Sequence, residues 1–575
     1  AIELVGDANL FMDANKTFKC ITGNYALTVS GGNILTLSNA GGYAIDALSV
    51  TISCPLVVQT SNVAVSAKSG ITINSSVNAS STNTCIGTVN GTITINADVT
   101  ATTSSSAAIL NRGLENGGDI VINKGTVTAT GGNAGIWSYG IAAGGNIAAE
   151  AGTVIHASGG TGIYAETGNI HLAGEVTANA NGDGGSGVYA QAGEVSLSTI
   201  SISSSGVGIS AYNGLTLNGV TETNTADTGL GTVNGTLTIN ADVTATTAKS
   251  AAILSRGRDQ GGDIIINSGT ITAIGGNTGR WAYGIAAGGN ITAKEGTVIH
   301  ASGGTGIYAE KGNIHLAGTV TSNANGDGGS GVYAQAGEVS LSTISISSSG
   351  VGISAYNGLT LNGVTETNTA DTGLGTVNGT LTINADVTAT TAKSAAILSR
   401  GRDQGGDIII NSGTITATGG NTGIWAYGIA AGGNITAKEG TIIHASGGTG
   451  IYAEKGNIHL AGEAISIAKG KDGNGLSAKA GDISVSTIDI TSAFVGISAF
   501  NGLTINGPLT ATATNTCIGT VNGTITINAD VTATTSSSAA ILCRGLDQGG
   551  DIIINKGTIR ATGGNTGEWA YGIAA

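Results

Sequence analysis

Four tryptophans recur along this sequence at a constant spacing of 144 residues, and each stands two residues before a tyrosine. The pairs are Trp137 and Tyr139, Trp281 and Tyr283, Trp425 and Tyr427, and Trp569 and Tyr571. Aromatic rings on a surface can stack on a sugar ring, so these pairs are candidate glycan-binding positions. The favoured alternative is that each tryptophan packs beneath its own loop. The preceding residue varies in polarity and should face water, which would place the tryptophan on the opposite side.

The six histidines form three pairs, and paired histidines could be zinc ligands. The members of a pair should lie at different points around the molecule, and neither a cysteine nor a third histidine accompanies them. The repeated "NANGDG" segments at Asn179–Gly184 and Asn323–Gly328 hold one carboxylate each, too few for calcium. We therefore predict no metal site and no cofactor. The histidine pairs are His156 and His171, His300 and His315, and His444 and His459.

Charged residues are too sparse and too scattered for an enzyme that acts on acidic polysaccharides. Such an enzyme needs clustered aspartates beside arginine or lysine, whereas here the carboxylates fall one or two per repeat segment. A net charge of −14 argues against nucleic-acid binding. The longest apolar runs, such as Ile264–Ile266, are far shorter than the ~20 residues that span a bilayer. We expect no catalytic residue, no nucleic-acid partner and no membrane insertion.

The cysteines also argue against a disulfide framework. They are odd in number, so at least one thiol stays unpaired within a chain. The central repeats carry Gly229 and Gly373 where the outer ones carry cysteine, so these positions need no sulfur. The five cysteines are Cys20, Cys54, Cys85, Cys517 and Cys543.

The elements that position all these residues belong to a repeat. The segment "GGDIIINSGTITAIGGN" at Gly261–Asn277 returns 144 residues later, at Gly405–Asn421, with one letter changed. A fixed long period is the signature of a repeat architecture. Each 144-residue unit divides into six shorter phrases of 21 to 32 residues, and the units begin at residues 84, 228, 372 and 516.

Within each phrase, aliphatic and polar residues alternate, as in "TLTIN" and "EVSLS", which is the period of a β-strand. Valine, isoleucine and threonine dominate, and the strands are separated by glycine and asparagine corners. The sequence therefore predicts an all-β protein, a single elongated parallel β-solenoid of about two dozen coils with a 144-residue super-repeat of six coils. At about 4.8 Å per coil it would be roughly 115 Å long.

The beginning of the chain departs from this pattern. We expect residues 1–42 to form diverged coils that act as a cap or an assembly end, and residues 43–575 to form the repeated solenoid. The last residues match the middle of a coil elsewhere, so subunits could stack head to tail into a filament through unpaired strand edges. A true cap, or a boundary within a longer protein, is the alternative. The candidate assembly residues are Ala1, Ile2, Leu4, Phe11, Met12, Phe18, Tyr571, Ile573 and Ala575.

The phrases "GTVTATGG", "GGDIxINxGT" and "GIxAxxGNI" resemble the β-solenoid stalks of bacterial cell-surface proteins and adhesins, in the style of filamentous haemagglutinin and autotransporter passengers. This resemblance spans nearly the whole chain and implies an extracellular or cell-surface location. We accordingly predict a non-enzymatic structural fibre or stalk whose main partner is another copy of itself. The alternative function is an adhesin that binds glycans or cell-wall polymers through the Trp-x-Tyr loops.

Overall fold

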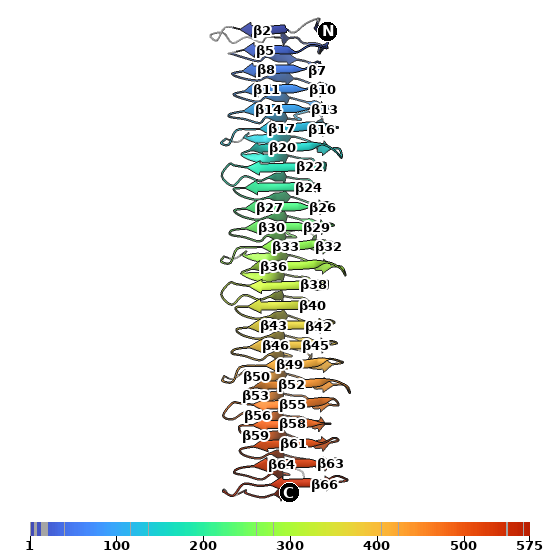
Figure 1. Cartoon of the computed structure of the whole chain (residues 1–575), viewed down its shortest axis with the longest axis vertical. Coiled ribbons are helices and arrows are strands. Elements are labelled where there is room, and N and C mark those ends of the chain that lie inside the picture. The colour runs from blue at the N-terminus through green and yellow to red at the C-terminus, as the bar shows by residue number, and fades with distance from the viewer. Residues whose placement is uncertain are drawn as a thin grey trace. The chain divides into compact units, whose positions relative to one another are not determined.

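A computed structural model describes residues 2–4, 8–12, 21–39, 41–115, 117–135, 137–259, 261–279, 281–403, 405–423, 425–547, 550–566 and 569–575. These residues are all β, without a helix, and fall into two compact units, Ala1–Gly289 and Asn290–Ala575. Each unit is a parallel β-solenoid, and together they contain about 23 coils (Figure 1). The fold class predicted from the sequence is confirmed, and the strand pattern is consistent with the 144-residue repeat.

Each coil contributes to three columns of parallel strands. One six-coil repeat of the first unit shows the arrangement. Its first column holds β12 (Ile86–Thr88), β15 (Ile109–Asn111), β18 (Tyr139–Ala143), β21 (Thr161–Ala165), β23 (Val188–Ala190) and β25 (Ile209–Ala211). The second column holds β13 (Gly91–Ile95), β16 (Gly117–Ile122), β19 (Ile147–Ala149) and β26 (Leu215–Leu217). The third column holds β14 (Val99–Thr103), β17 (Thr126–Thr130), β20 (Val154–Gly159) and β27 (Thr221–Thr225). The long strands β22 (Ile170–Ala180) and β24 (Val195–Ser204) each run through both columns.

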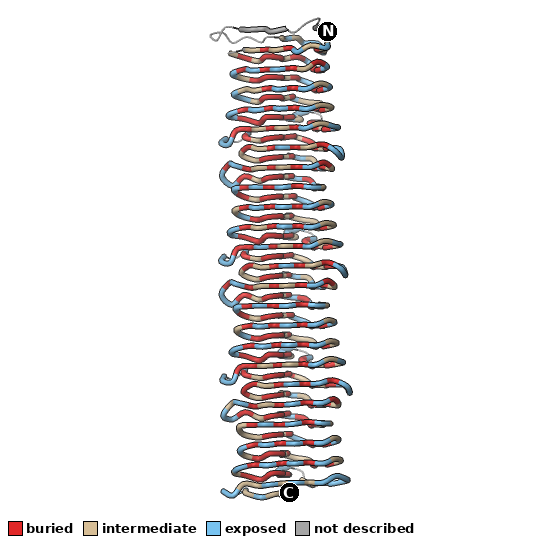
Figure 2. The backbone as a smooth tube through the Cα atoms, in the orientation of Figure 1, coloured by how far each residue is buried: buried red, intermediate tan, exposed pale blue. Residues whose placement is uncertain are grey.

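The core is a set of aliphatic ladders inside each unit. In the first column Ile86 pairs with Ile109, and Ile109 pairs with Ile141, all of them fully buried. Along β14, buried and exposed residues alternate strictly, and Figure 2 shows this alternation in coil after coil. Because the side-chain period is two, every coil buries one aliphatic set and presents a polar set to water.

The corners between columns are tight enough to require glycine. Gly91 has a φ of +77°, and a Cβ there would lie 1.8 Å from the carbonyl oxygen of Ser69 in the preceding coil. Gly379 in the second unit repeats this geometry, with a φ of +70°. Only a residue without a side chain tolerates both the left-handed conformation and the close approach of the neighbouring backbone.

Ladders of hydrogen-bonded asparagine side chains stabilise another corner, the one that follows the second-column strands. The Nδ2 of Asn96 donates to Oδ1 of Asn74 at 2.8 Å, and Nδ2 of Asn123 donates to Oδ1 of Asn96 at 2.7 Å. The second unit repeats the ladder, where Asn411 donates to Asn384 at 2.8 Å. Side-chain amides therefore continue the inter-coil hydrogen bonding where no strand is present.

The predicted N-terminal range also begins with paired strands. β1 (Ile2–Leu4) pairs in parallel with β4 (Ala26–Gly31), and β2 (Ala8–Met12) with β5 (Leu35–Asn39). Four of the candidate assembly residues, Ile2, Leu4, Phe11 and Met12, therefore lie on strands. Ala1 and Phe18 lie outside the described residues.

Candidate functional site

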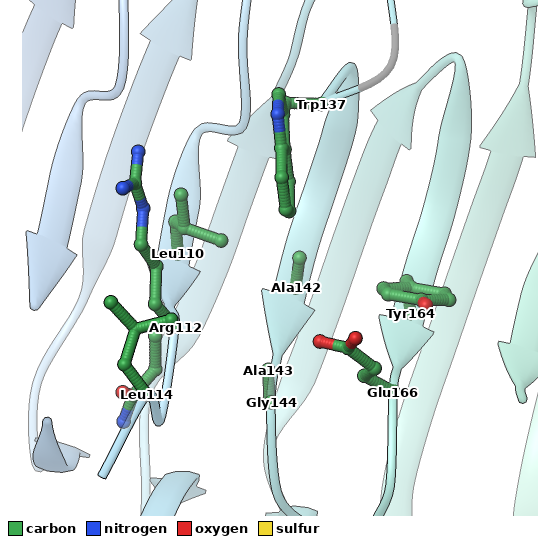
Figure 3. Close-up of a pocket in the computed structure, with 10 residues that line it drawn as sticks. Leu110, Arg112, Leu114, Trp137, Ala142, Ala143, Gly144, Tyr164 and Glu166 are labelled. Carbon is green, nitrogen blue, oxygen red and sulfur yellow. The ribbon is translucent and has the colours of Figure 1, made fainter. Parts of the chain in front are cut away.

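Three consecutive first-column strands of the first unit build a trough on the outer surface. Leu110 of β15 is in register with Ala142 of β18, and Ala142 with Tyr164 of β21. The residues that follow these strands repeat the pattern, with Arg112, Gly144 and Glu166 on successive coils. In these two rows the middle coil thus carries only alanine and glycine, and the coils on either side carry larger side chains. Figure 3 shows Arg112 and Glu166 on opposite sides of this small-residue row.

A loop that leaves the solenoid before β18 closes the upper side of the trough. It carries Trp137, a residue that is 45% exposed. Tyr139 is turned differently, because its ring stacks on Tyr164 with centroids 4.8 Å apart and an interplanar angle of 6°. Together the two tyrosines cover Leu110 and Ala142, which are buried although they stand on the outward side of the strands.

The tryptophans do not pack beneath their loops, so that expectation from the sequence is wrong. Trp137, Trp281, Trp425 and Trp569 are between 41% and 56% exposed. Nor do the paired rings form one flat platform, since Trp137 meets Tyr139 edge to face at 6.4 Å and 80°. The alternation rule that assigned the tryptophan to the inner side holds only within strands, and Trp137 lies in the loop before β18.

The resulting cavity, which we call the first pocket, has a volume of about 250 Å³. Its walls combine aromatic, aliphatic and charged side chains over a floor of alanine and glycine. The residues that define it are Leu110, Arg112, Leu114, Trp137, Ala142, Ala143, Gly144, Tyr164 and Glu166.

The second unit contains a copy of this cavity, the second pocket, with a volume of about 190 Å³. Arg400 takes the place of Arg112, 288 residues later in the chain. The tyrosine stack is preserved, with Tyr427 and Tyr452 at 5.0 Å and 7°. The second pocket is built by β47 (Ile397–Ser399), β50 (Tyr427–Ala431) and β53 (Thr449–Ala453), and its lining includes Leu398, Arg400, Arg402, Trp425, Ala430, Ala431, Gly432, Tyr452 and Glu454.

The first pocket holds one positive and one negative group that are both available to a ligand. The guanidinium carbon of Arg112 lies 5.9 Å from the centroid of the Trp137 ring, a cation–π distance. Neither Arg112 nor Glu166 forms a side-chain hydrogen bond or ion pair with another described residue. Their backbones are two coils apart, about 10 Å, so the trough separates the two charges.

The tyrosine that lines each pocket, Tyr164 or Tyr452, remains protonated at neutral pH. Burial raises the pKa of Tyr164 to about 12, with smaller contributions from Tyr139 and Glu166, and its hydroxyl donates to Oε1 of Gln191. Burial likewise raises the pKa of Tyr452 to about 12. At neutral pH the walls of both pockets therefore present uncharged phenol rings, which act as apolar surfaces.

The histidines and cysteines do not add a second site. His156 and His171 are exposed, as the alternation predicts for His171. Within the described ranges, no group of three or more histidine, cysteine, aspartate or glutamate side chains is placed to hold a metal ion. The cysteines that the structure describes are all free and buried, and Cys20 lies outside the described residues: Cys54, Cys85, Cys517 and Cys543.

Sequence reasoning found the tryptophans but missed the other walls of the pocket, Arg112, Tyr164 and Glu166. Arg112 stands on the coil of β15, whereas Tyr164 and Glu166 stand two coils later on the coil of β21, and the coils differ in length, so the spacing in the chain shows no regular period. Aligning the coils by their first-column isoleucines would have revealed them. In "ILNRG", "IAAGG" and "IYAETG" the second letters then form one row, which includes Tyr164, and the fourth letters form another, with Arg112 and Glu166 on either side of a glycine.

No family model, no curated protein and no solved structure matches this chain. The β-solenoid itself is confirmed, whereas the resemblance to bacterial surface stalks stays a prediction. The described residues contain no helix long and apolar enough to cross a lipid bilayer.

Proposed function

We propose that this protein is a non-enzymatic, extracellular structural protein whose solenoid forms a rigid fibre or stalk, with copies stacked head to tail. The stacked coils support this proposal, because each coil is stabilised mainly by its neighbours and the body extends by simple repetition. Such a protein needs no cofactor, and its principal partner is a second copy of the same chain.

The observation that carries the proposal is the continuous parallel pairing from coil to coil within each unit. β45 (Gly379–Ile383) pairs with β48 (Gly405–Ile410), and β48 pairs with β51 (Ile435–Ala437). Ile383, Ile410 and Ala437 therefore stack in one fully buried ladder. Because successive coils share one register, the strand edge of one coil matches the edge of another, which favours pairing between copies of the chain.

Electron microscopy and sedimentation of the purified 575-residue chain test the assembly. We expect filaments whose length grows with protein concentration, because each added copy continues the coil-to-coil pairing. Single particles at every concentration would overturn head-to-tail assembly.

A second candidate function is adhesion to glycans, and the exposed tryptophan rings favour it. An exposed aromatic ring beside hydrogen-bonding groups in a cavity is suited to a carbohydrate. A glycan array probed with the whole chain tests this function. Specific binding to one group of glycans is expected, and no binding to any glycan would leave the chain with a structural role alone.

A further inference from the structure

We propose that the first pocket and the second pocket each bind one pyranose ring of a neutral oligosaccharide. This inference rests on the second candidate function and deepens it, because it names the binding residues and the class of sugar. It also replaces the Trp-x-Tyr pair as the binding unit, since Tyr139 is turned away to stack on Tyr164.

The apolar part of the pocket matches the faces of a sugar ring. One face of many pyranoses presents a patch of C–H groups, which packs on the face or edge of an aromatic ring. Trp137 and Tyr164 supply such rings on two sides of the trough, and the buried Ala142 forms an apolar floor between them. The trough is therefore shaped for a flat, partly apolar ligand that enters edgewise.

The polar part of the pocket matches hydroxyl groups. A guanidinium only donates hydrogen bonds and an ionised carboxylate only accepts them. A sugar hydroxyl does both, so a ring between Arg112 and Glu166 can accept from one side and donate to the other. Both groups are charged, which makes each of these hydrogen bonds stronger than a neutral one.

Charge favours a neutral sugar over an acidic one. In the first pocket a uronic acid carboxylate that approached Arg112 would also lie near Glu166, and the repulsion would offset the attraction. The chain as a whole carries a net charge of −14, which disfavours the approach of a polyanion.

Size limits the ligand to one ring in each cavity. Cavities that enclose drug-sized ligands have volumes of about 300 to 1,000 Å³. The two pockets, at about 250 and 190 Å³, are smaller. The remaining rings of an oligosaccharide would extend along the solvent-exposed side of the trough.

The test uses the whole chain and two neutral probes, a β-linked glucose tetramer and a β-linked N-acetylglucosamine tetramer, with a galacturonic acid tetramer for comparison. Binding is measured by isothermal titration calorimetry. We expect saturable binding of at least one neutral tetramer, tighter than that of the acidic one. The double variant W137A/W425A should lose at least tenfold in affinity, because it removes the tryptophan wall of each pocket.

The double variant Y212A/Y356A is the matched control. It removes two aromatic side chains that are each 39% exposed and that line neither pocket. Its affinity should equal that of the unmodified chain. The double variant E166Q/E454Q keeps the shape of the side chains and should weaken binding at least threefold, which tests the site even if the tryptophan variant is destabilised.

The outcomes separate this inference from the function on which it rests. Neutral tetramers that bind the tryptophan and glutamine variants as tightly as the unmodified chain would overturn the pocket and leave glycan adhesion standing. Preference for the acidic tetramer would overturn the neutral class of ligand. Absence of binding to every tetramer and to every glycan on the array would overturn both.

Discussion

The first and second pockets are two copies of one design whose surroundings have diverged. The arginine-to-tryptophan distance is 5.9 Å in the first pocket and 5.7 Å in the second, and both tyrosine pairs are stacked. The differences lie at the edge of the pockets and in the next coil. Leu114, Tyr189 and Gln191 of the first unit correspond to Arg402, Ser477 and Lys479 of the second.

This comparison shows which features fix the geometry. The stack of Tyr427 on Tyr452 forms without the third tyrosine that extends the stack of the first unit. The common elements are the register of three strands and the small residues of the middle coil. We infer that inter-coil register shapes the pocket, whereas the surrounding side chains adjust its charge. The following experiments test that conclusion, in order of expected effect.

The largest effect should come from the glycine at the centre of the trough. A Cβ on Gly144 would lie 2.2 Å from the carbonyl oxygen of Arg112, and one on Gly432 would lie 2.0 Å from that of Arg400. Because both obstacles are backbone, Gly144→Ala and Gly432→Ala should each force the coils apart and cost about 3 kcal/mol.

Hydrogen exchange read peptide by peptide would detect this cost as lost protection in β18 or β50 of the altered unit. Gly32→Ala is the control, since a Cβ at Gly32 meets nothing within 4 Å. Unchanged exchange in either altered unit would show that register is not the common determinant.

Alkaline pH should destabilise both units through their buried thiols. Burial raises the pKa of Cys85, in the first unit, from 9.0 to about 11, and that of Cys517, in the second, from 9.0 to about 12. Below pH 9 both thiols are protonated in folded and unfolded chains and cost nothing. Above pH 9 the unfolded thiol ionises first, so stability falls until the folded pKa is passed.

At pH 10.5 each thiol should cost about 2 kcal/mol relative to pH 8. Cys85→Ala and Cys517→Ala should remove that part of the loss, as measured by urea denaturation at the two pH values. Alanine is a mild change here, because the repeats carry glycine at the equivalent Gly229 and Gly373. An identical pH dependence with and without the thiols would contradict the assignment.

A smaller effect, this time a gain in stability, is expected at a buried threonine that both units contain. Thr223 and Thr367 point into the core, where their hydroxyls have no hydrogen-bond partner among the residues that the structure describes. Valine has the same shape without the buried hydroxyl, so Thr223→Val and Thr367→Val should each stabilise the protein by about 1 kcal/mol.

Thr225→Val is the matched control for these substitutions, because the Thr225 hydroxyl donates to the carbonyl oxygen of Asp227 at 3.2 Å. It should destabilise the protein by about the same amount. Thermal unfolding measures all three variants. A lower midpoint for Thr223→Val would mean that its hydroxyl is satisfied in solution, by water for example.

The smallest effect should follow from making the first unit resemble the second. Tyr189→Ser removes the outer ring, which lies 5.6 Å from Tyr164 at a tilt of 51°. We expect a loss of about 0.5 kcal/mol and an intact stack of Tyr139 on Tyr164. Near-ultraviolet circular dichroism would report the stack, and its disappearance would show that the third tyrosine is needed after all.

The fold was predictable because its signals are local and periodic. The alternation in "TLTIN" corresponds to the inward Leu237 and Ile239 of β29 (Gly235–Ile239), both fully buried. The same reasoning succeeded for the aliphatic ladders, since each coil carries its own version of the pattern. A period of 144 residues further limited the solution to a repeated structure.

The pocket was only half predictable, because it depends on contacts between coils of unequal length. The recurrence of Trp137 marked the position, but its exposure was misjudged from a rule for strands. The roles of Arg112 and Glu166 follow from the parallel register of β15, β18 and β21, which places residues 54 positions apart in the chain on opposite sides of one small-residue row. No spacing in the sequence expresses that relation directly.

The three-coil construction of the pocket has a genetic consequence. Unequal crossing-over between misaligned copies of the gene adds or removes whole multiples of 144 residues, and every such product keeps Arg112, Trp137 and Glu166 equivalents on three successive coils. A deletion of one coil would instead bring mismatched rows together and destroy a pocket. Recombination among near-identical copies therefore changes the number of pockets in whole steps while leaving the structure of each one intact.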